Sequence, residues 1–224
     1  MTLLSLSTSC DTYHLPLAWS TPPPAPLLHP HEEQWKGYIG ARVGQALQEK
    51  TTNKFKDNIL LNLNGGGVFQ HKSFLFEANG WAGFAHYRFY DFDTLHVPNR
   101  NIITYAVQAH LNAGWAPRLG KNKKSKLELG GSLGIGVENS DDTFPFPMTF
   151  SPFIGAGFSL SPVTTLGFRW NFVGLGTGFT ASVKYKNAQF FAATMPYALI
   201  GMNSKPWTMG VLVFLDSKQR RQGE

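Results

Sequence analysis

The sequence contains very little cysteine and little charge. Cys10 is the single cysteine among 224 residues, which excludes a disulfide within the chain and a multi-cysteine metal site. Charged residues make up 15% of the chain, whereas hydrophobic residues make up 42% and include 18 Phe, 7 Tyr and 6 Trp. This composition excludes an intrinsically disordered protein, because a chain so rich in apolar side chains must bury them.

Long hydrophobic runs are also missing. No uninterrupted apolar stretch approaches the roughly 18–20 residues that a membrane-spanning helix needs, which excludes a helical membrane protein. The 23 glycines are spread through the apolar runs, an arrangement that is unfavourable in helices and suits crowded, curved strands. Length and composition therefore indicate one all-β domain.

The net charge of +6 is concentrated in two short stretches, 121–126 and 218–222. No stripe of stacking aromatics interleaves these charges, so we expect no nucleic-acid partner, whereas anionic lipid head groups would be attracted. The start of the chain is a poor secretory signal, and "STPPPAPLLHPH" is typical of a proline-rich linker. We therefore predict an unstructured segment over 1–34, a barrel over 35–216 and a basic tail over 217–224.

Apolar and polar residues alternate along "KLELGGSLGIGVE", residues 126–138. Leu133 and Ile135 share one face of this predicted strand, and Glu128 and Ser132 share the other. The same period of two predicts ten strands. They are expected over 35–48, 59–70, 73–91, 101–115, 126–138, 149–160, 163–172, 178–185, 188–197 and 207–215, the last two being less clearly two-faced.

The third of these segments changes its alternation. A β-bulge near Asn79 and Gly80 would allow the change, and beyond it Trp81 and Ala85 would oppose His86. The expected side chains inside a barrel are Arg42, His86, Arg88, His110, Glu128 and Arg169. The two histidines lack a metal-binding spacing, so we expect hydrogen-bonded lumen residues and no metal.

Alternating strands fit a soluble barrel or sandwich with its polar side out, or a membrane barrel with its polar side in. Aromatic residues near the strand ends, loops of alternating length and polar faces with few, balanced charges favour the membrane. We therefore predict an antiparallel up-and-down transmembrane β-barrel of about ten strands, with eight as the alternative. Its expected location is the bacterial outer membrane.

Several stretches resemble a known family. "NGWAGFAHYRFYD" (79–91), "FPFPMTFSP" (144–152), "IGAGF" (154–158) and "SPVT" (161–164) are similar to parts of the lipid A palmitoyltransferase family, an eight-stranded outer-membrane barrel. The resemblance covers about residues 35–186 and leaves the last two predicted strands unmatched.

The resemblance implies a lipid-modifying enzyme and two kinds of site. Pro147 and Pro152 match prolines that open a lateral gap for a phospholipid chain, although a stiff loop and a bulged strand start explain them equally. Asp91 matches the family's catalytic Asp, whereas Phe92 stands where its Ser should be, and no His lies near 40–44. A substitute cluster of candidate catalytic residues comprises Asp91, Thr94 and His96.

Three functions follow from these expectations. The first is a lipid A acyltransferase-like enzyme that acts on membrane lipids and lipopolysaccharide as a monomer without a cofactor. The second is a non-catalytic barrel, either a narrow pore or a structural or adhesion protein; few apolar inward positions, such as Leu60, Val68, Phe84 and Phe153, favour it over an enzyme with an acyl pocket. The third is a soluble carrier of hydrophobic ligands, which would need the Leu, Ile and Val side chains inside.

Overall fold

The computed structural model describes residues 25–30, 35–45, 55–89, 100–139, 148–173, 176–194 and 207–215. Within these ranges, the side chains of 55–58, 87–89, 100–102, 173 and 176 are left out of the description. In the described ranges, no helix is long and apolar enough to cross a membrane.

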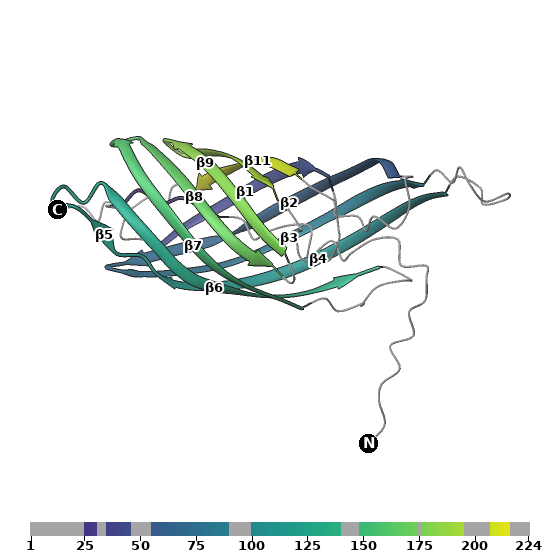
Figure 1. The fold of residues 1–224 in the computed structure, drawn as a ribbon, viewed down its shortest axis with the longest axis horizontal. Coiled ribbons are helices and arrows are strands. Elements are labelled where there is room, and N and C mark those ends of the chain that lie inside the picture. The colour runs from purple at the N-terminus through teal and green to yellow at the C-terminus, as the bar shows by residue number, and fades with distance from the viewer. Residues whose placement is uncertain are drawn as a thin grey trace, which may run out of the picture.

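Antiparallel strands make up almost all of the described chain (Figure 1). They are β1 (Trp35–Gly44), β2 (Phe55–His71), β3 (Phe74–Phe89), β4 (Arg100–Trp115), β5 (Arg118–Leu119), β6 (Ser125–Glu138), β7 (Met148–Ser161), β8 (Thr164–Val173), β9 (Gly176–Tyr185), β10 (Ala188–Thr194) and β11 (Trp207–Leu215). Because β5 has two residues and lies beside β6, ten long strands form the wall.

The ten long strands close into one barrel. Each strand pairs with its neighbours in sequence, β1 pairs with β11, and β4 pairs with β6 across β5. Figure 1 shows the strands steeply tilted around the barrel axis. Closure satisfies the backbone hydrogen bonds without an exposed edge, as a barrel in lipid requires. The predicted antiparallel up-and-down barrel of about ten strands is confirmed.

Short turns gather at one end of the barrel. The β2–β3, β7–β8 and β9–β10 connections are two residues each, and the β5 segment lies at the same end. Trp35 pairs with Phe69 near the β2–β3 turn, and Leu215 pairs with Gly37, so the strand wall begins and ends there too. We call this the short-turn end.

The alternation of the sequence becomes two faces of the wall. Leu133 and Ile135 are 53% and 58% exposed on the outer face, whereas Glu128 and Ser132 are buried inside. The outer face is apolar on every long strand, with residues such as Ile39, Leu63, Phe150, Phe168 and Val213. This orientation excludes the soluble carrier, because its Leu, Ile and Val side chains would have to point inward.

The predicted bulge in β3 is absent. The β2–β3 ladder runs from Asp57–Arg88 to His71–Phe74 without a shift, so one parity faces inward along this whole stretch. Trp81 and Ala85 are therefore buried in the lumen. His86 has the outward parity, as does Phe84, and the prediction that these two side chains face the lumen is wrong. Trp81 can lie inside because its indole N–H has a partner there, Gln108.

Residues 25–30 have no regular secondary structure but are packed inside the barrel. Leu27 is 4% exposed and Leu28 is 0% exposed. This stretch was expected to be unstructured, and the expectation is corrected for these six residues. About eight strands leave an interior that side chains just fill, so ten strands leave room for an extra segment. We call residues 25–30 the plug segment.

Candidate functional site in the barrel lumen

A buried ion cluster lies on the inner faces of β6 and β8. Glu128 accepts from Lys126 Nζ at 2.7 Å and from Arg169 Nη2 at 2.8 Å. The three side chains are at most 5% exposed. Arg169 also lies over the Phe153 ring, 4.4 Å from its centroid. Pairing on both carboxylate oxygens makes this charged group tolerable inside the barrel.

A second buried carboxylate, Glu77 on β3, has neutral partners. Tyr38 Oη donates to it at 2.5 Å, Asn79 Nδ2 at 2.9 Å and Asn112 Nδ2 at 2.6 Å. These donors come from β1, β3 and β4, so side chains of the wall alone complete the group. We call Tyr38, Glu77, Asn79 and Asn112 the Glu77 cluster.

His110 belongs to a polar chain on the inner faces of β3, β4, β6 and β7. Its Nε2 lies 2.8 Å from Gln108 Oε1, which also accepts from Trp81 Nε1 at 3.0 Å. Gln108 Nε2 donates to Thr149 Oγ1 at 3.1 Å, and Ser132 Oγ lies 3.4 Å from His110 Nδ1. Both ring nitrogens of His110 therefore have protein partners. Among the described residues, no group of three or more His, Cys, Asp or Glu could hold a metal ion.

The plug segment is attached to the inner wall by polar contacts from two strands. Gln189 on β10 accepts from Leu27 N at 2.7 Å and donates through Nε2 to the Ala25 carbonyl at 2.8 Å. His29 Nε2 lies 2.6 Å from Ser159 Oγ on β7. A cleft beside the segment is lined by Leu27, Glu128 and Arg169, so the segment covers the ion cluster.

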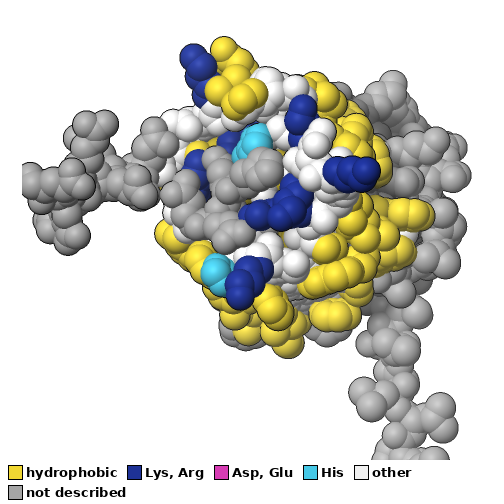
Figure 2. All heavy atoms as spheres, turned by 90° about the vertical axis from the view of Figure 1, so that its left-hand side faces the viewer, with side chains coloured by type: hydrophobic (Ala, Val, Ile, Leu, Met, Phe, Trp, Pro, Cys, Tyr) yellow, Lys and Arg dark blue, Asp and Glu magenta, His cyan; other side chains and the backbone are white. Residues whose placement is uncertain are grey.

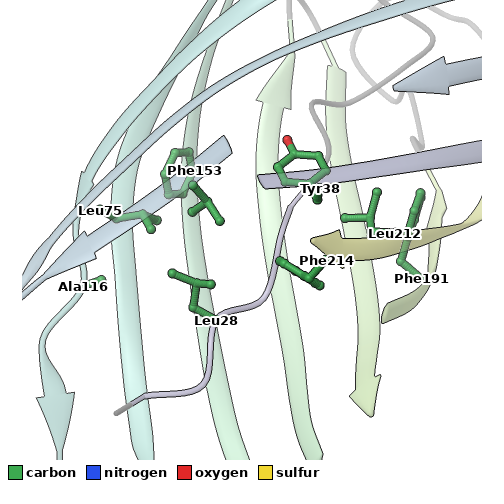
Figure 3. Packing of buried hydrophobic residues seen from close by; sticks show 9 residues of the cluster. Leu28, Tyr38, Leu75, Ala116, Phe153, Phe191, Leu212 and Phe214 are labelled. Carbon is green, nitrogen blue, oxygen red and sulfur yellow. The ribbon is translucent and has the colours of Figure 1, made fainter. Parts of the chain in front are cut away.

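An apolar cluster surrounds Leu28 (Figure 3). Its buried members are Leu28, Tyr38, Val68, Leu75, Ala116, Phe153, Phe191, Leu212 and Phe214. In Figure 3, Leu28 lies between Leu75 and Phe153 on one side and Phe214 on the other. The segment therefore fills the interior between strands that are far apart around the barrel.

Other lumen side chains carry polar atoms that have no hydrogen-bond partner in the described protein. They are Asn64, Thr104, Ser151, Asn171, Thr180 and Thr208, all buried. Buried hydroxyl and amide groups need a partner, and water supplies it where protein does not. The lumen is thus built to hold water as well as side chains.

The short-turn end carries basic side chains. Figure 2 looks onto this end and shows Lys and Arg side chains around the rim, with no described Asp or Glu visible between them. Lys72, Lys121, Lys123, Lys124 and Lys186 are exposed on the turns there. We call these five lysines the basic rim.

The structure describes only some of the residues expected in sites. Arg42, His110, Glu128 and Arg169 are buried in the lumen. The side chain of Arg88 lies outside the described residues, as do the candidate catalytic residues Asp91, Thr94 and His96 and the candidate gate residue Pro147. Pro152 lies on β7, exposed on the outer face.

Two lumen residues were missed from the sequence. Lys126 was assigned to the solvated basic run 121–126, yet it shares the parity of Glu128, which is the signal that could have placed it inside. Gln189 lies in a stretch with weak alternation, and its partners Ala25 and Leu27 are more than 160 residues away. Sequence spacing gives no indication of so distant a contact.

A closed barrel with an apolar outer face and an ionic, hydrated lumen is the architecture of integral outer-membrane proteins. The fold therefore defines the chain as an outer-membrane β-barrel, as predicted. No family model matches the sequence, and no curated protein matches it.

Solved structures show similar barrels. The outer membrane protein Ail of Yersinia pestis in a phospholipid bilayer nanodisc covers 81% of this chain and 100% of its own, at 14% identity and a TM-score of 0.34. Neisserial surface protein A covers 80% and 95%, at 11% identity and 0.32. The COG4313 outer membrane channel from Pseudomonas putida F1 covers 80% and 96%, at 13% identity and 0.35. These TM-scores lie below 0.5, so only the barrel's own geometry bears on its function.

Proposed function

We propose that this protein is a narrow, non-catalytic channel of the outer membrane whose lumen the plug segment closes at the short-turn end. The observation that carries the proposal is the inner surface, which combines paired charges with buried polar atoms that need water. An enzyme that holds an acyl chain would instead need a continuous apolar interior. Since one chain closes its own barrel, a monomer suffices.

The charges support a preference for anions and polar neutral solutes. The buried cations Arg42, Lys126, Arg169 and Lys184 outnumber the buried anions Glu77, Glu128 and Glu138 among the described residues. The basic rim adds further positive charge at the short-turn end. Rings of Lys and Arg favour anions in membrane pores.

The test is the ion conductance of the purified protein in planar lipid bilayers. Because Leu28 lies in an apolar cluster, Leu28→Asp should expel the plug segment and raise the conductance at least several-fold over the wild type. Leu119→Asp is the matched control, since it makes the same change on exposed β5 at the same end. If Leu28→Asp conducts no more than the wild type, the channel is disproved.

A lipid A acyltransferase-like enzyme is the second candidate. It is supported by the β7–β8 ladder, which ends at the pair Phe153–Asn171 although β7 begins at Met148 and β8 continues to Val173. Pro152 is the next residue, and a proline cannot donate to a ladder. A lateral opening there would admit membrane lipids or lipopolysaccharide, with Asp91, Thr94 and His96 as the predicted catalytic residues.

Mass spectrometry of lipid A from cells with and without the gene tests this candidate. An additional acyl chain that depends on the gene would establish the enzyme. An unchanged lipid A profile leaves the channel as the function.

A further inference from the structure

The wall of the lumen holds the plug segment by its main chain, in the way that a strand edge holds a peptide. The Ala25 carbonyl and the Leu27 N–H point to the same side of the segment, and the single side-chain amide of Gln189 bonds both. A neighbouring β-strand offers an extended peptide the same donor and acceptor. These two hydrogen bonds do not depend on the identity of the peptide's side chains.

Two neighbouring leucines provide the apolar contacts. Leu27 packs over glycines of β7 and β8, and a Cβ on Gly167 would lie 2.8 Å from Leu27 Cδ1. Leu28 enters the apolar cluster and is 0% exposed. The wall therefore offers one shallow place over glycine and one deep apolar pocket, at adjacent positions of the bound chain.

The plug segment is separable from the barrel. It joins no strand ladder, and the ten long strands close without it. Its contacts with Gln189 and Ser159 are side-chain contacts of the wall. Loss of the segment would leave the strand pairing unchanged and uncover Gln189, the apolar pocket and the ion cluster together.

We propose that this place in the lumen is a binding site for short, extended apolar peptides, which the chain's own residues 25–30 occupy as a tethered ligand. The recognised chemistry is a free main-chain N–H and C=O two residues apart, followed by two leucine-like side chains. The inference rests on the proposed function, because a peptide reaches the site only through a lumen open to solvent. A peptide that binds there competes with the plug segment and takes over its blocking role.

The experiment uses the full chain with Leu27→Asp and Leu28→Asp, which empties the site without altering its wall. The probe is the labelled hexapeptide Ala-Pro-Leu-Leu-His-Pro, acetylated and amidated. Binding is measured by fluorescence anisotropy in lipid nanodiscs, with empty nanodiscs as the background. We expect saturable binding to the double variant, at least 10-fold weaker binding to the wild type, and renewed block of the double variant's conductance by the peptide.

Two controls make the binding specific. Adding Gln189→Ala to the double variant removes two hydrogen bonds and should weaken peptide binding about 10-fold. Adding Asn64→Ala instead removes a buried lumen amide of β2 that has no recorded partner, and should leave binding unchanged. A peptide with both leucines replaced by aspartate should not bind.

The outcomes separate the two proposals. Specific binding without any conductance in the double variant supports the peptide site and overturns the channel. Conductance that the peptide does not reduce, with no specific binding, overturns the peptide site and leaves the channel. Equal binding to wild type and double variant also overturns the site. If the double variant does not fold, Leu27→Ser with Leu28→Ser replaces it in the same measurements.

Discussion

The two buried carboxylates of the lumen are satisfied in different ways. Glu77 accepts hydrogen bonds from three neutral side chains that all belong to β1, β3 and β4. Glu128 instead pairs with two cations, and the plug segment lies beside it. The Glu77 cluster is thus complete within the wall, whereas the ion cluster is covered by a piece of chain outside the sheet.

The difference shows which part of the lumen can change. Removing the plug segment takes no hydrogen bond from Glu77, but it exposes Glu128 and Arg169 to solvent. Charges become less costly when water reaches them, so the ion cluster tolerates both a covered and an open state. A fixed polar region and an uncoverable ionic region therefore lie within one lumen.

The largest expected effect is a difference in stability between the same substitution at the two carboxylates. Glu128→Gln leaves two buried cations without their counterion and should lower the free energy of unfolding by about 3–5 kcal/mol. Glu77→Gln should cost about 1–3 kcal/mol, because an amide can still accept from one or two of the neutral donors. Urea unfolding of the barrel in lipid vesicles measures both. Equal losses would remove the distinction between the clusters.

The next effect separates two fully buried leucines of the apolar cluster. Leu212→Ala leaves a cavity in the wall and should cost about 2–5 kcal/mol of unfolding free energy without raising conductance. Leu28→Ala should raise conductance while changing the stability of the strand wall much less, since the plug segment joins no ladder. The same unfolding assay and bilayer recordings check both variants. A conducting Leu212→Ala variant would contradict the assignment of Leu28 as the closing residue.

A smaller effect is expected where the β7–β8 ladder stops. Pro152→Ala supplies the N–H that proline lacks and should stabilise the barrel by about 0.5–1.5 kcal/mol if the ladder then extends past Phe153. Hydrogen exchange at residue 152, measured by NMR, reports whether the new N–H is protected. Rapid exchange there would mean that something besides proline ends the ladder.

The smallest effect concerns the space under Leu27. Gly167→Ala places a methyl group against Leu27 and Ser182 and should loosen the plug segment, raising conductance about two-fold, which corresponds to about 0.4 kcal/mol. Gly80→Ala is the matched control, because glycine is also replaced in a strand but on the outer face. Unchanged conductance in Gly167→Ala would show that Leu27 has other room to move.

The sequence was sufficient for the strands and insufficient for one face of them. Alternation located ten strands because lipid outside and polar groups inside impose a period of two on every segment. In β3 it failed, because Trp81 was interpreted as a residue at the membrane interface and His86 as a lumen residue. The unbroken ladder with β2 shows the reverse, since a buried indole finds Gln108 and needs no interface.

The sequence by itself determined the all-β class, the strand positions and the outward direction of most apolar side chains, since each follows from the local period and the surrounding solvent. Only the tertiary structure decided that Leu27 and Leu28 lie in the lumen, that Gln189 holds them, and that Lys126 pairs with Glu128 inside. Barrel closure brings together residues more than 160 positions apart, and no local pattern encodes which of them will meet.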